Sequence, residues 1–418
     1  MKLRLKNIGI LRNAAIEVAG ITVVAGENNT GKSTFGKALF AVFSALHDLS
    51  ERVRMMRQRS ALGAFRFYFL RKLVAGDEQW YNQGKNFLKT EALSEELIDK
   101  IAAMIPVRLS AEVGDFKREL LQIKTIDDGE IIRNIMLASL QGEFHEYIQN
   151  QLVRDEKAEI ELKIQSASTT VALSKENVEE INGLRELNHR PIYFDDFPIE
   201  QLDSTSALAA YSQYGLINRH TVELAKQVKG EADSDASSDD LVMQGILADK
   251  KLGPVLDRLK EICRGSLKLV NGKIRYVNEL MPQAQLPMGS VSSGLKTFLI
   301  LQDLVRNGTL REHGTIIMDE PEIHLHPAWQ VVLAEMIVLL QRELGLHVLL
   351  TSHSPYFISA IDAYSKKHGI IGRNHYYFSS RTADGIAVED VTNRIRVIYD
   401  SLAAPYQTIQ DVFSEQQA

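Results

Sequence analysis

The pattern of hydrophobic and polar positions divides the chain into two strand-and-helix segments separated by a long helical one. Apolar residues alternate with polar ones over residues 2–18, which predicts a pair of strands. A short apolar run at Ile21–Ala25 predicts a buried strand, and apolar positions at helical spacing predict a helix over Lys32–Leu46. Residues 1–46 are therefore expected to begin an α/β domain.

The middle of the chain shows a different pattern. Residues 47–155 have apolar positions at helical spacing and no strand-like alternation, which predicts a helical insertion. Residues 156–264 are expected to form a mixed strand-and-helix lobe, with short strands at Glu159–Ile164 and Pro191–Phe194. Within this lobe, the acidic, serine-rich stretch 230–240 is expected to be a surface loop.

The alternation of strands and helices returns at residues 265–379, where a hairpin is expected around Asn271-Gly272. Together with residues 1–46, this region predicts an α/β fold with a mainly parallel sheet covered on both faces. Residues 380–418 are expected to form a strand-and-helix tail. The expected elements after the hairpin are a helix over Ser293–Val305, a strand over Thr315–Met318, a helix over Pro327–Glu343, a strand over His347–Leu350 and a helix over Pro355–Ile361.

Composition adds limits on location and partners. The 418 residues are 45% hydrophobic and 24% charged, which is ordinary for a globular protein with a large core. The net charge of −6 is not that of a uniformly basic nucleic-acid binder. No apolar run reaches the roughly 20 residues of a membrane-spanning helix. The single cysteine, Cys263, lies in an expected helix over Val255–Cys263 and favours a reducing cytoplasm without disulfides.

The segment Gly26–Ser33 follows an expected strand and opens an expected helix, as a phosphate-binding loop does. Glycines allow the backbone to curl so that its N–H groups point at phosphates, and the helix N-terminus adds partial positive charge. Lys32 is expected to reach the β- and γ-phosphates, and the Ser33 hydroxyl to coordinate Mg²⁺. The expected ATP-binding residues here are Gly26, Asn28, Asn29, Thr30, Gly31, Lys32, Ser33 and Thr34.

Two carboxylates follow the apolar strand Thr315–Met318. Asp319, at the strand tip, is expected to hold Mg²⁺ together with Ser33. Glu320 is expected to polarise the attacking water, and Lys32, Glu320 and a histidine described below are the candidate catalytic residues. An isolated Asp-Glu pair before a proline is often only a surface turn, so the prediction depends on the phosphate loop.

Two further motifs, together with the phosphate loop and the two carboxylates, point to one family. Ser292, Ser293 and Gly294 open an expected helix, and His353 follows an expected strand. In order and spacing, these motifs resemble those of ABC-type ATPases. The resemblance implies that Ser292–Gly294 cap the γ-phosphate held by a second copy, while His353 is the switch histidine that contacts the γ-phosphate. The signature match is partial, because Ser293 and Leu295 stand where the family has Gly and Gln.

The run from Asp319 to Pro327 resembles the RecF/SMC-like branch of these ATPases, which includes OLD-family and phage-defence ATPases of the Septu and PARIS type. His326 stands where the branch has a D-loop Asp, and no Q-loop glutamine can be assigned. His324 and His326 alone lack the third ligand of a zinc-like site. The chain has no long heptad run, no spaced acidic pair of a Toprim nuclease, and a helical insertion too long for a transporter subunit.

A cluster of basic and aromatic residues at 52–72 allows two interpretations. It could bind nucleic acid or an acidic partner, or it could be a solvated helix face whose apolar side is packed; the second is favoured. Its members are Arg52, Arg54, Arg57, Arg59, Arg66, Arg71, Lys72, Phe65, Phe67, Tyr68 and Phe69.

Three functions follow as hypotheses. The first is a slow, Mg²⁺-dependent ATPase that dimerises head-to-tail around ATP and controls a separate effector, such as a nuclease or toxin in phage defence. The second is a RecF-like repair ATPase that clamps DNA. The third is an ATP-dependent assembly scaffold with little turnover. No membrane partner is expected.

Overall fold

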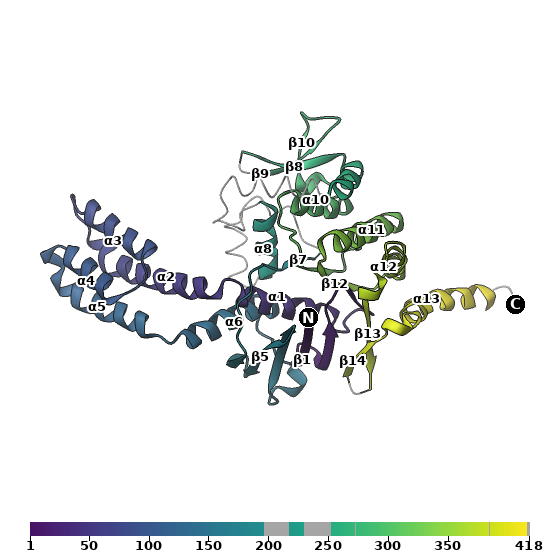
Figure 1. Cartoon of the computed structure of the whole chain (residues 1–418), viewed down its shortest axis with the longest axis horizontal. Helices are drawn as coiled ribbons and strands as arrows, with labels where there is room; N and C mark the ends of the chain where they lie inside the picture. The colour runs from purple at the N-terminus through teal and green to yellow at the C-terminus, as the bar shows by residue number, and fades with distance from the viewer. Residues whose placement is uncertain (196–216, 230–251, 272, 384, 416–418) are drawn as a thin grey trace. The chain divides into compact units, whose positions relative to one another are not determined.

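The computed structural model of the chain describes residues 1–195, 217–229, 252–271, 273–383 and 385–415 (Figure 1). They form two compact units. The first unit consists of residues 1–44, 137–185 and 189–418, and the second of residues 45–136 and 186–188. The acidic stretch 230–240 lies outside the described residues.

The first unit is built on a six-stranded, mainly parallel sheet with the strand order β14-β13-β3-β12-β11-β7. Each pair of neighbouring strands is parallel except β13 and β14. This confirms the predicted α/β class, although the sequence pattern did not predict that β13 and β14 join this sheet. The strands are β3 (Ile21–Gly26), β7 (Ile192–Phe194), β11 (Thr315–Asp319), β12 (His347–Ser352), β13 (His375–Thr382) and β14 (Gly385–Asp390).

Helices pack against both faces of this sheet. Ile316 and Met318 point to one face and join the main buried cluster with residues of α8, α10, α11 and α12. Ile317 and Tyr193 point to the other face, where a Cβ on Gly36 of α1 would lie within 3.0 Å of both side chains. The helices are α1 (Lys32–Leu46), α8 (Arg219–Val228), α10 (Ser293–Arg306), α11 (Pro327–Leu344), α12 (Pro355–Lys367) and α13 (Arg396–Glu415), with residues 252–263 also helical.

Two antiparallel sheets complete the first unit. One has the order β2-β1-β4-β5-β6 and the other β10-β9-β8. The predicted first strand pair, the strand near residue 160 and the hairpin after residue 265 are confirmed, whereas β5 and β6 were not predicted. The strands are β1 (Lys2–Ile8), β2 (Leu11–Glu17), β4 (Ala158–Ile164), β5 (Ala167–Ser174), β6 (Asn177–Asn182), β8 (Gly265–Val270), β9 (Lys273–Asn278) and β10 (Gln285–Pro287).

The second unit is helical and has its own aromatic core. Phe65, Phe69 and Phe116 are fully buried at its centre, with ring centroids 5.1–5.7 Å apart. Its helices are α2 (Leu49–Phe69), α3 (Glu78–Thr90), α4 (Glu95–Met104), α5 (Ser110–Thr125) and the first part of α6 (Asp128–Phe144). Within the described residues, every helix is too short or too polar to cross a bilayer.

The basic cluster at 52–72 lies mainly on α2, where Phe65 and Phe69 are buried while Phe67 is exposed. Phe65 and Phe69 belong to the buried core, so neither ring is available for stacking on a base. Arg57 forms an ion pair with Asp128 at 2.5 Å, and Lys72 forms one with Glu112. These contacts support the interpretation of a helix with a packed apolar side and a solvated face.

Candidate nucleotide site

The two glycines of the phosphate loop occupy positions that other residues do not fit. Gly26, at the end of β3, has φ 154°, and a Cβ there would lie 2.1 Å from the carbonyl oxygen of Ser379. Gly31 has φ 83°, and its Cβ would lie 2.7 Å from Leu11 Cδ2. The loop therefore runs closely between β13 and the start of β2 before it enters α1.

Hydrogen bonds hold the loop in a tight curve. Thr30 Oγ1 donates to the carbonyl oxygen of Glu27 at 2.8 Å, and Ser379 Oγ donates to the carbonyl oxygen of Thr30 at 2.6 Å. Asn28 and Asn29 are exposed at the tip of the curve. Thr34, in the first turn of α1, donates its backbone N–H to the carbonyl oxygen of Gly31 at 3.2 Å.

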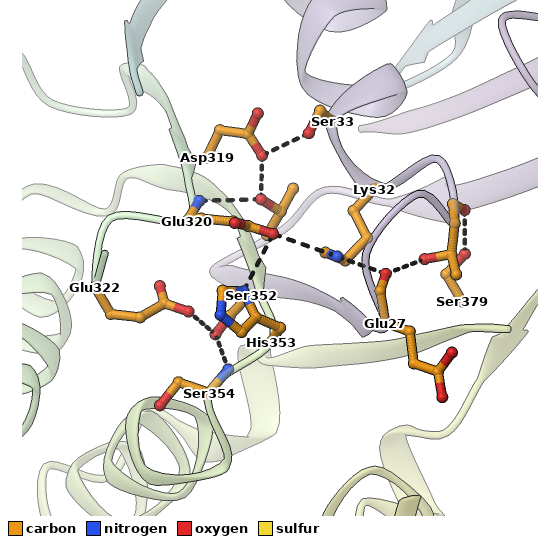
Figure 2. Close-up of polar contacts among 12 residues, drawn as sticks. Glu27, Lys32, Ser33, Asp319, Glu320, Glu322, Ser352, His353, Ser354 and Ser379 are labelled. Carbon is orange, nitrogen blue, oxygen red and sulfur yellow. Dashed lines mark hydrogen bonds and ion pairs between the residues drawn. The ribbon is translucent and has the colours of Figure 1, made fainter. Parts of the chain in front are cut away.

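Lys32 places a positive charge inside this curve. Its side chain is only 4% exposed, so its ammonium needs partners in the protein. Lys32 Nζ donates to the carbonyl oxygen of Glu27 at 2.8 Å and lies 3.3 Å from Glu320 Oε1. The loop lysine and the second carboxylate of β11 are thus in direct contact, as Figure 2 shows.

The predicted metal-binding pair also meets. Ser33 Oγ donates to Asp319 Oδ1 at 3.0 Å, and Thr351 Oγ1 donates to the same oxygen. A hydroxyl and a carboxylate oxygen at this distance are hard oxygen donors of the kind that Mg²⁺ prefers. The residues at the start of α1 and the end of β11 therefore fit the predicted ion.

Glu320 connects the loop to the predicted switch histidine. Its backbone has φ 48°, an unfavourable conformation for a non-glycine residue, and its N–H is held by the carbonyl and hydroxyl oxygens of Thr351, both at 3.1 Å. His353 Nδ1 lies 3.3 Å from the same Glu320 Oε1 that contacts Lys32 (Figure 2). One carboxylate oxygen thus lies between two side chains that can carry positive charge.

The turn that carries His353 is fixed by a buried network. Ser352 Oγ donates to Glu322 Oε1 and accepts the backbone N–H of Ser354 at 3.1 Å. Ser354 Oγ donates to Gln330 Oε1 at 2.7 Å. Burial raises the pKa of Glu322, an effect that the Ser352 hydroxyl opposes in part. The network anchors the histidine turn to the segment that follows Glu320.

His326, which stands where the family has the D-loop Asp, has a structural role as a helix cap. It is the N-cap of α11, and its Nδ1 accepts the backbone N–H of Ala328 at 3.3 Å. An imidazole nitrogen can replace a carboxylate in this capping role. Across the described part of the chain, no group of three or more His, Cys, Asp or Glu side chains is arranged to hold a metal ion.

The signature residues lie elsewhere in the unit. Ser292 is the N-cap of α10, yet its side chain makes no capping hydrogen bond, and both Ser292 and Ser293 are exposed. Gly294 packs on the D-loop, where a Cβ would lie 3.0 Å from Leu325 Cδ2. In the described residues, none of the three joins the contacts around Lys32 and Glu320.

Three site residues were not predicted from the sequence. Thr351 donates to the carboxylate of Asp319 and accepts the backbone N–H of Glu320, and Ser379 holds the loop from β13. The Tyr193 hydroxyl lies 3.3 Å from Asp319 Oδ2. Tyr193 belongs to a strand that the sequence pattern predicted, but only the parallel pairing of β7 with β11 brings it to the site.

A comparison with known protein families gives a match over part of the chain. Residues 226–359 match a family described as an AAA domain, putative AbiEii toxin of a type IV TA system. The matched range includes Ser292–Gly294, Asp319, Glu320 and His353 but not the phosphate loop. No curated protein matches the chain.

Among solved structures, the chain is similar to three SMC head domains. The head domain from Thermotoga maritima has 11% identity and a TM-score of 0.37, over 93% of this chain and 98% of its own. An SMC head bound to the C-terminal winged-helix domain of ScpA has 12% identity and a TM-score of 0.41, over 95% and 98%. An SMC head with an extended coiled coil, bound to the C-terminal domain of ScpA derived from Pyrococcus furiosus, has 11% identity and a TM-score of 0.40, over 96% and 98%.

The family match and the geometry of the phosphate loop concern different parts of the chain. The family match covers the predicted signature, the two carboxylates and the predicted switch histidine. The loop conformation and the Lys32–Glu320 contact come from the structure alone. Together they support a nucleotide-binding ATPase that resembles the AAA and ABC-type ATPases.

Proposed function

We propose that the chain binds ATP with Mg²⁺ at this site and hydrolyses it slowly. One observation carries the proposal: Glu320 Oε1 lies 3.3 Å from both Lys32 Nζ and His353 Nδ1. The three side chains come from the phosphate loop, the end of β11 and the turn after β12. A chance glycine-rich turn would not be joined to a strand-end carboxylate and a histidine in this way.

Each residue has a role that follows from its position. The loop N–H groups of Gly26–Thr34 and the Lys32 ammonium bind the phosphates. Ser33 and Asp319 hold Mg²⁺, which neutralises phosphate charge. Glu320 accepts a proton from the water that attacks the γ-phosphorus, while the bond to the ADP oxygen breaks.

His353 is the remaining candidate for contact with the γ-phosphate. Its side chain is 42% exposed, whereas that of Lys32 is buried, so His353 lies at the open side of the site. Its contact with Glu320 orients the ring. Donation of a hydrogen bond to a phosphate oxygen from this position would help to orient the γ-phosphate.

Two variants with matched controls test the ATPase proposal. We expect Lys32→Ala to weaken ATP binding more than about tenfold, because a buried charge-assisted contact is lost. Lys37→Ala, on the same helix, is the control. We expect Glu320→Gln to retain ATP binding but to slow phosphate release about 100-fold or more, as for a general base. Glu335→Gln on α11 is its control.

Two outcomes would contradict these roles. Hydrolysis at the wild-type rate by Glu320→Gln would remove the role of Glu320. ATP binding without phosphate release in the wild type would instead favour the assembly scaffold. Binding is measured with a fluorescent ATP analogue, and release with a phosphate-binding assay.

We further propose that the active species is a head-to-tail dimer, in which Ser292–Gly294 of each copy contact the nucleotide of the other. The exposed serines at the start of α10, without a capping bond of their own, are available to phosphate oxygens. This proposal predicts that ATP converts the Glu320→Gln protein into a stable dimer.

The output that we propose is control of a separate effector, such as a nuclease or toxin, in cytoplasmic phage defence. The description of the matched family, which names a putative toxin of a type IV TA system, supports this direction. Purification from the native host with and without ATP tests it. A co-purifying nuclease or toxin would support effector control, and co-purifying DNA would favour the RecF-like clamp instead.

A further inference from the structure

A buried histidine lies between two carboxylates beside the nucleotide site. His220, near the start of α8, is 1% exposed. Its Nδ1 lies 2.6 Å from Glu143 Oε2, and its Nε2 lies 2.8 Å from Asp195 Oδ2. Its backbone N–H also donates to Glu143 Oε1 at 2.9 Å. A histidine can donate from both ring nitrogens only as the imidazolium cation, so His220 is a buried positive charge.

Electrostatics agree with this geometry. Burial on its own would lower the pKa of His220, but Glu143 and Asp195 outweigh it and raise the pKa to about 9. Glu143 belongs to the end of α6 and is fully buried. The cation therefore ties α8 to α6 and to the residue that follows β7.

The imidazolium ring packs flat on Tyr193. The two ring centroids are 4.1 Å apart and the planes differ by 19°. Phe40 of α1 contacts both rings edge-on, at 5.8 Å from Tyr193 and 5.9 Å from His220. A cation over an aromatic face is attracted to it, and Tyr193 is 1% exposed. The tyrosine ring is thus held by His220 on one face and by an edge contact with Phe40.

The fixed ring directs its hydroxyl at Asp319. Tyr193 pairs with Ile317 across the parallel strands β7 and β11, so its hydroxyl reaches Asp319 Oδ2 at 3.3 Å. The other oxygen, Oδ1, accepts from Ser33 and Thr351. A Cβ on Gly36 would lie 2.9 Å from this hydroxyl, so the absence of a side chain there leaves room for it. Asp319 is therefore held by one donor on Oδ2 and two on Oδ1.

We propose that Tyr193 is a positioning residue for Asp319, with the buried His220 cation holding its ring. This inference rests on the proposed function, because it matters only if Asp319 helps to hold Mg²⁺. The hydroxyl fixes the rotation of the carboxylate so that Oδ1 stays beside Ser33. Loss of the hydroxyl lets the carboxylate rotate, which weakens binding of nucleotide with Mg²⁺ and leaves metal-free binding unchanged.

Tyr193→Phe tests this, because it removes the hydroxyl and keeps the ring. We expect the affinity for a fluorescent ATP analogue with Mg²⁺ to fall about threefold to tenfold, as for one long hydrogen bond. With EDTA in place of Mg²⁺ the affinity should not change. The Mg²⁺ concentration for half-maximal phosphate release should rise by a similar factor. Tyr376→Phe, another buried tyrosine of the same sheet, is the control.

The outcomes separate the two proposals. A Tyr193→Phe protein with wild-type affinity in Mg²⁺, or with equal losses in Mg²⁺ and EDTA, would overturn the positioning role. A wild-type protein that binds no ATP would overturn the proposed function itself.

A separate variant tests whether His220 holds the ring of Tyr193. His220→Gln can donate to only one of the two carboxylates at a time and carries no charge. We expect it to shift the Mg²⁺ dependence in the same direction as Tyr193→Phe, and the double variant to match the larger single effect. Additive effects would overturn the link between the two residues. If His220→Gln does not fold, Tyr193→Phe alone decides the proposal.

Discussion

Two buried basic residues, Lys32 and His220, support the neighbouring carboxylates of Glu320 and Asp319. Lys32 contacts Glu320 directly, whereas His220 acts through the ring of Tyr193. Carboxylate or carbonyl oxygens contact each of them in place of water. Single charged residues therefore hold the carboxylates of Glu320 and Asp319 in place when no nucleotide is bound.

His220 ties the stability of the first unit to pH. Its pKa is raised from 6.5 to about 9 on folding, so its contribution is complete below pH 6.5 and is lost as the pH rises towards 9. At ~1.4 kcal/mol per pH unit, raising this pKa from 6.5 to about 9 corresponds to about 3–4 kcal/mol. We expect the stability difference between wild type and His220→Gln to shrink by this order between pH 6.5 and 9.5. Urea unfolding at several pH values measures it, and a pH-independent difference would show that His220 is not charged.

At the scale of elements, α2 separates core from surface within a few residues. Phe69 is fully buried among Phe65, Trp80 and Phe116, whereas Phe67 is 79% exposed. We expect Phe69→Ala to destabilise the second unit by about 3–5 kcal/mol, because it leaves a cavity. Phe67→Ala should change stability by less than about 0.5 kcal/mol. Hydrogen exchange of residues 45–136 measures both. Equal effects would contradict the packing of α2.

The elements that the sequence predicted are those with a simple apolar pattern. The strands β3, β11 and β12 are almost entirely buried and each has a central apolar run, and α1 begins and ends at the predicted residues. By contrast, α8 was missed because it buries His220, Thr221 and Gln227, whose polar groups do not mark a core face. Ser and Thr residues similarly weaken the pattern of β5.

The site residues likewise fall into those that the sequence predicted and those that it did not. The phosphate loop and Asp319–Glu320 are contiguous motifs whose chemistry is visible in the sequence. Tyr193 lies 126 positions before Asp319, and their contact arises only from the pairing of β7 with β11. Residues that support the motifs through strand pairing have no local signal of their own.

At the scale of the whole molecule, we propose that the contacts around Glu320 and the exposed serines at the start of α10 belong to two different nucleotide sites. Lys32 and Glu320 touch within one chain, so we propose that both act on the same nucleotide. Ser292 does not take part in these contacts, and we propose that it acts on the nucleotide of a second copy. The two kinds of variant should therefore behave differently when inactive proteins are mixed.

Mixing Lys32→Ala with Ser292→Glu tests this directly. The exposed Ser292 tolerates a glutamate, which repels phosphate, so we expect each variant alone to be inactive. In a mixed dimer one site combines an intact loop with an intact signature. Phosphate release should therefore recover to about a quarter of the wild-type rate, because half of randomly paired dimers are mixed and each has one intact site.

Mixing Lys32→Ala with Glu320→Gln is the matched control. These two changes damage both sites of a mixed dimer, since Lys32 and Glu320 belong to the same half, and activity should not return. Recovery in both mixtures would contradict the assignment of Lys32 and Glu320 to one nucleotide. No recovery in the first mixture, although mixed dimers form, would show that Ser292 does not complete the site of its partner. Full activity of Ser292→Glu alone would show that the signature is not needed for hydrolysis.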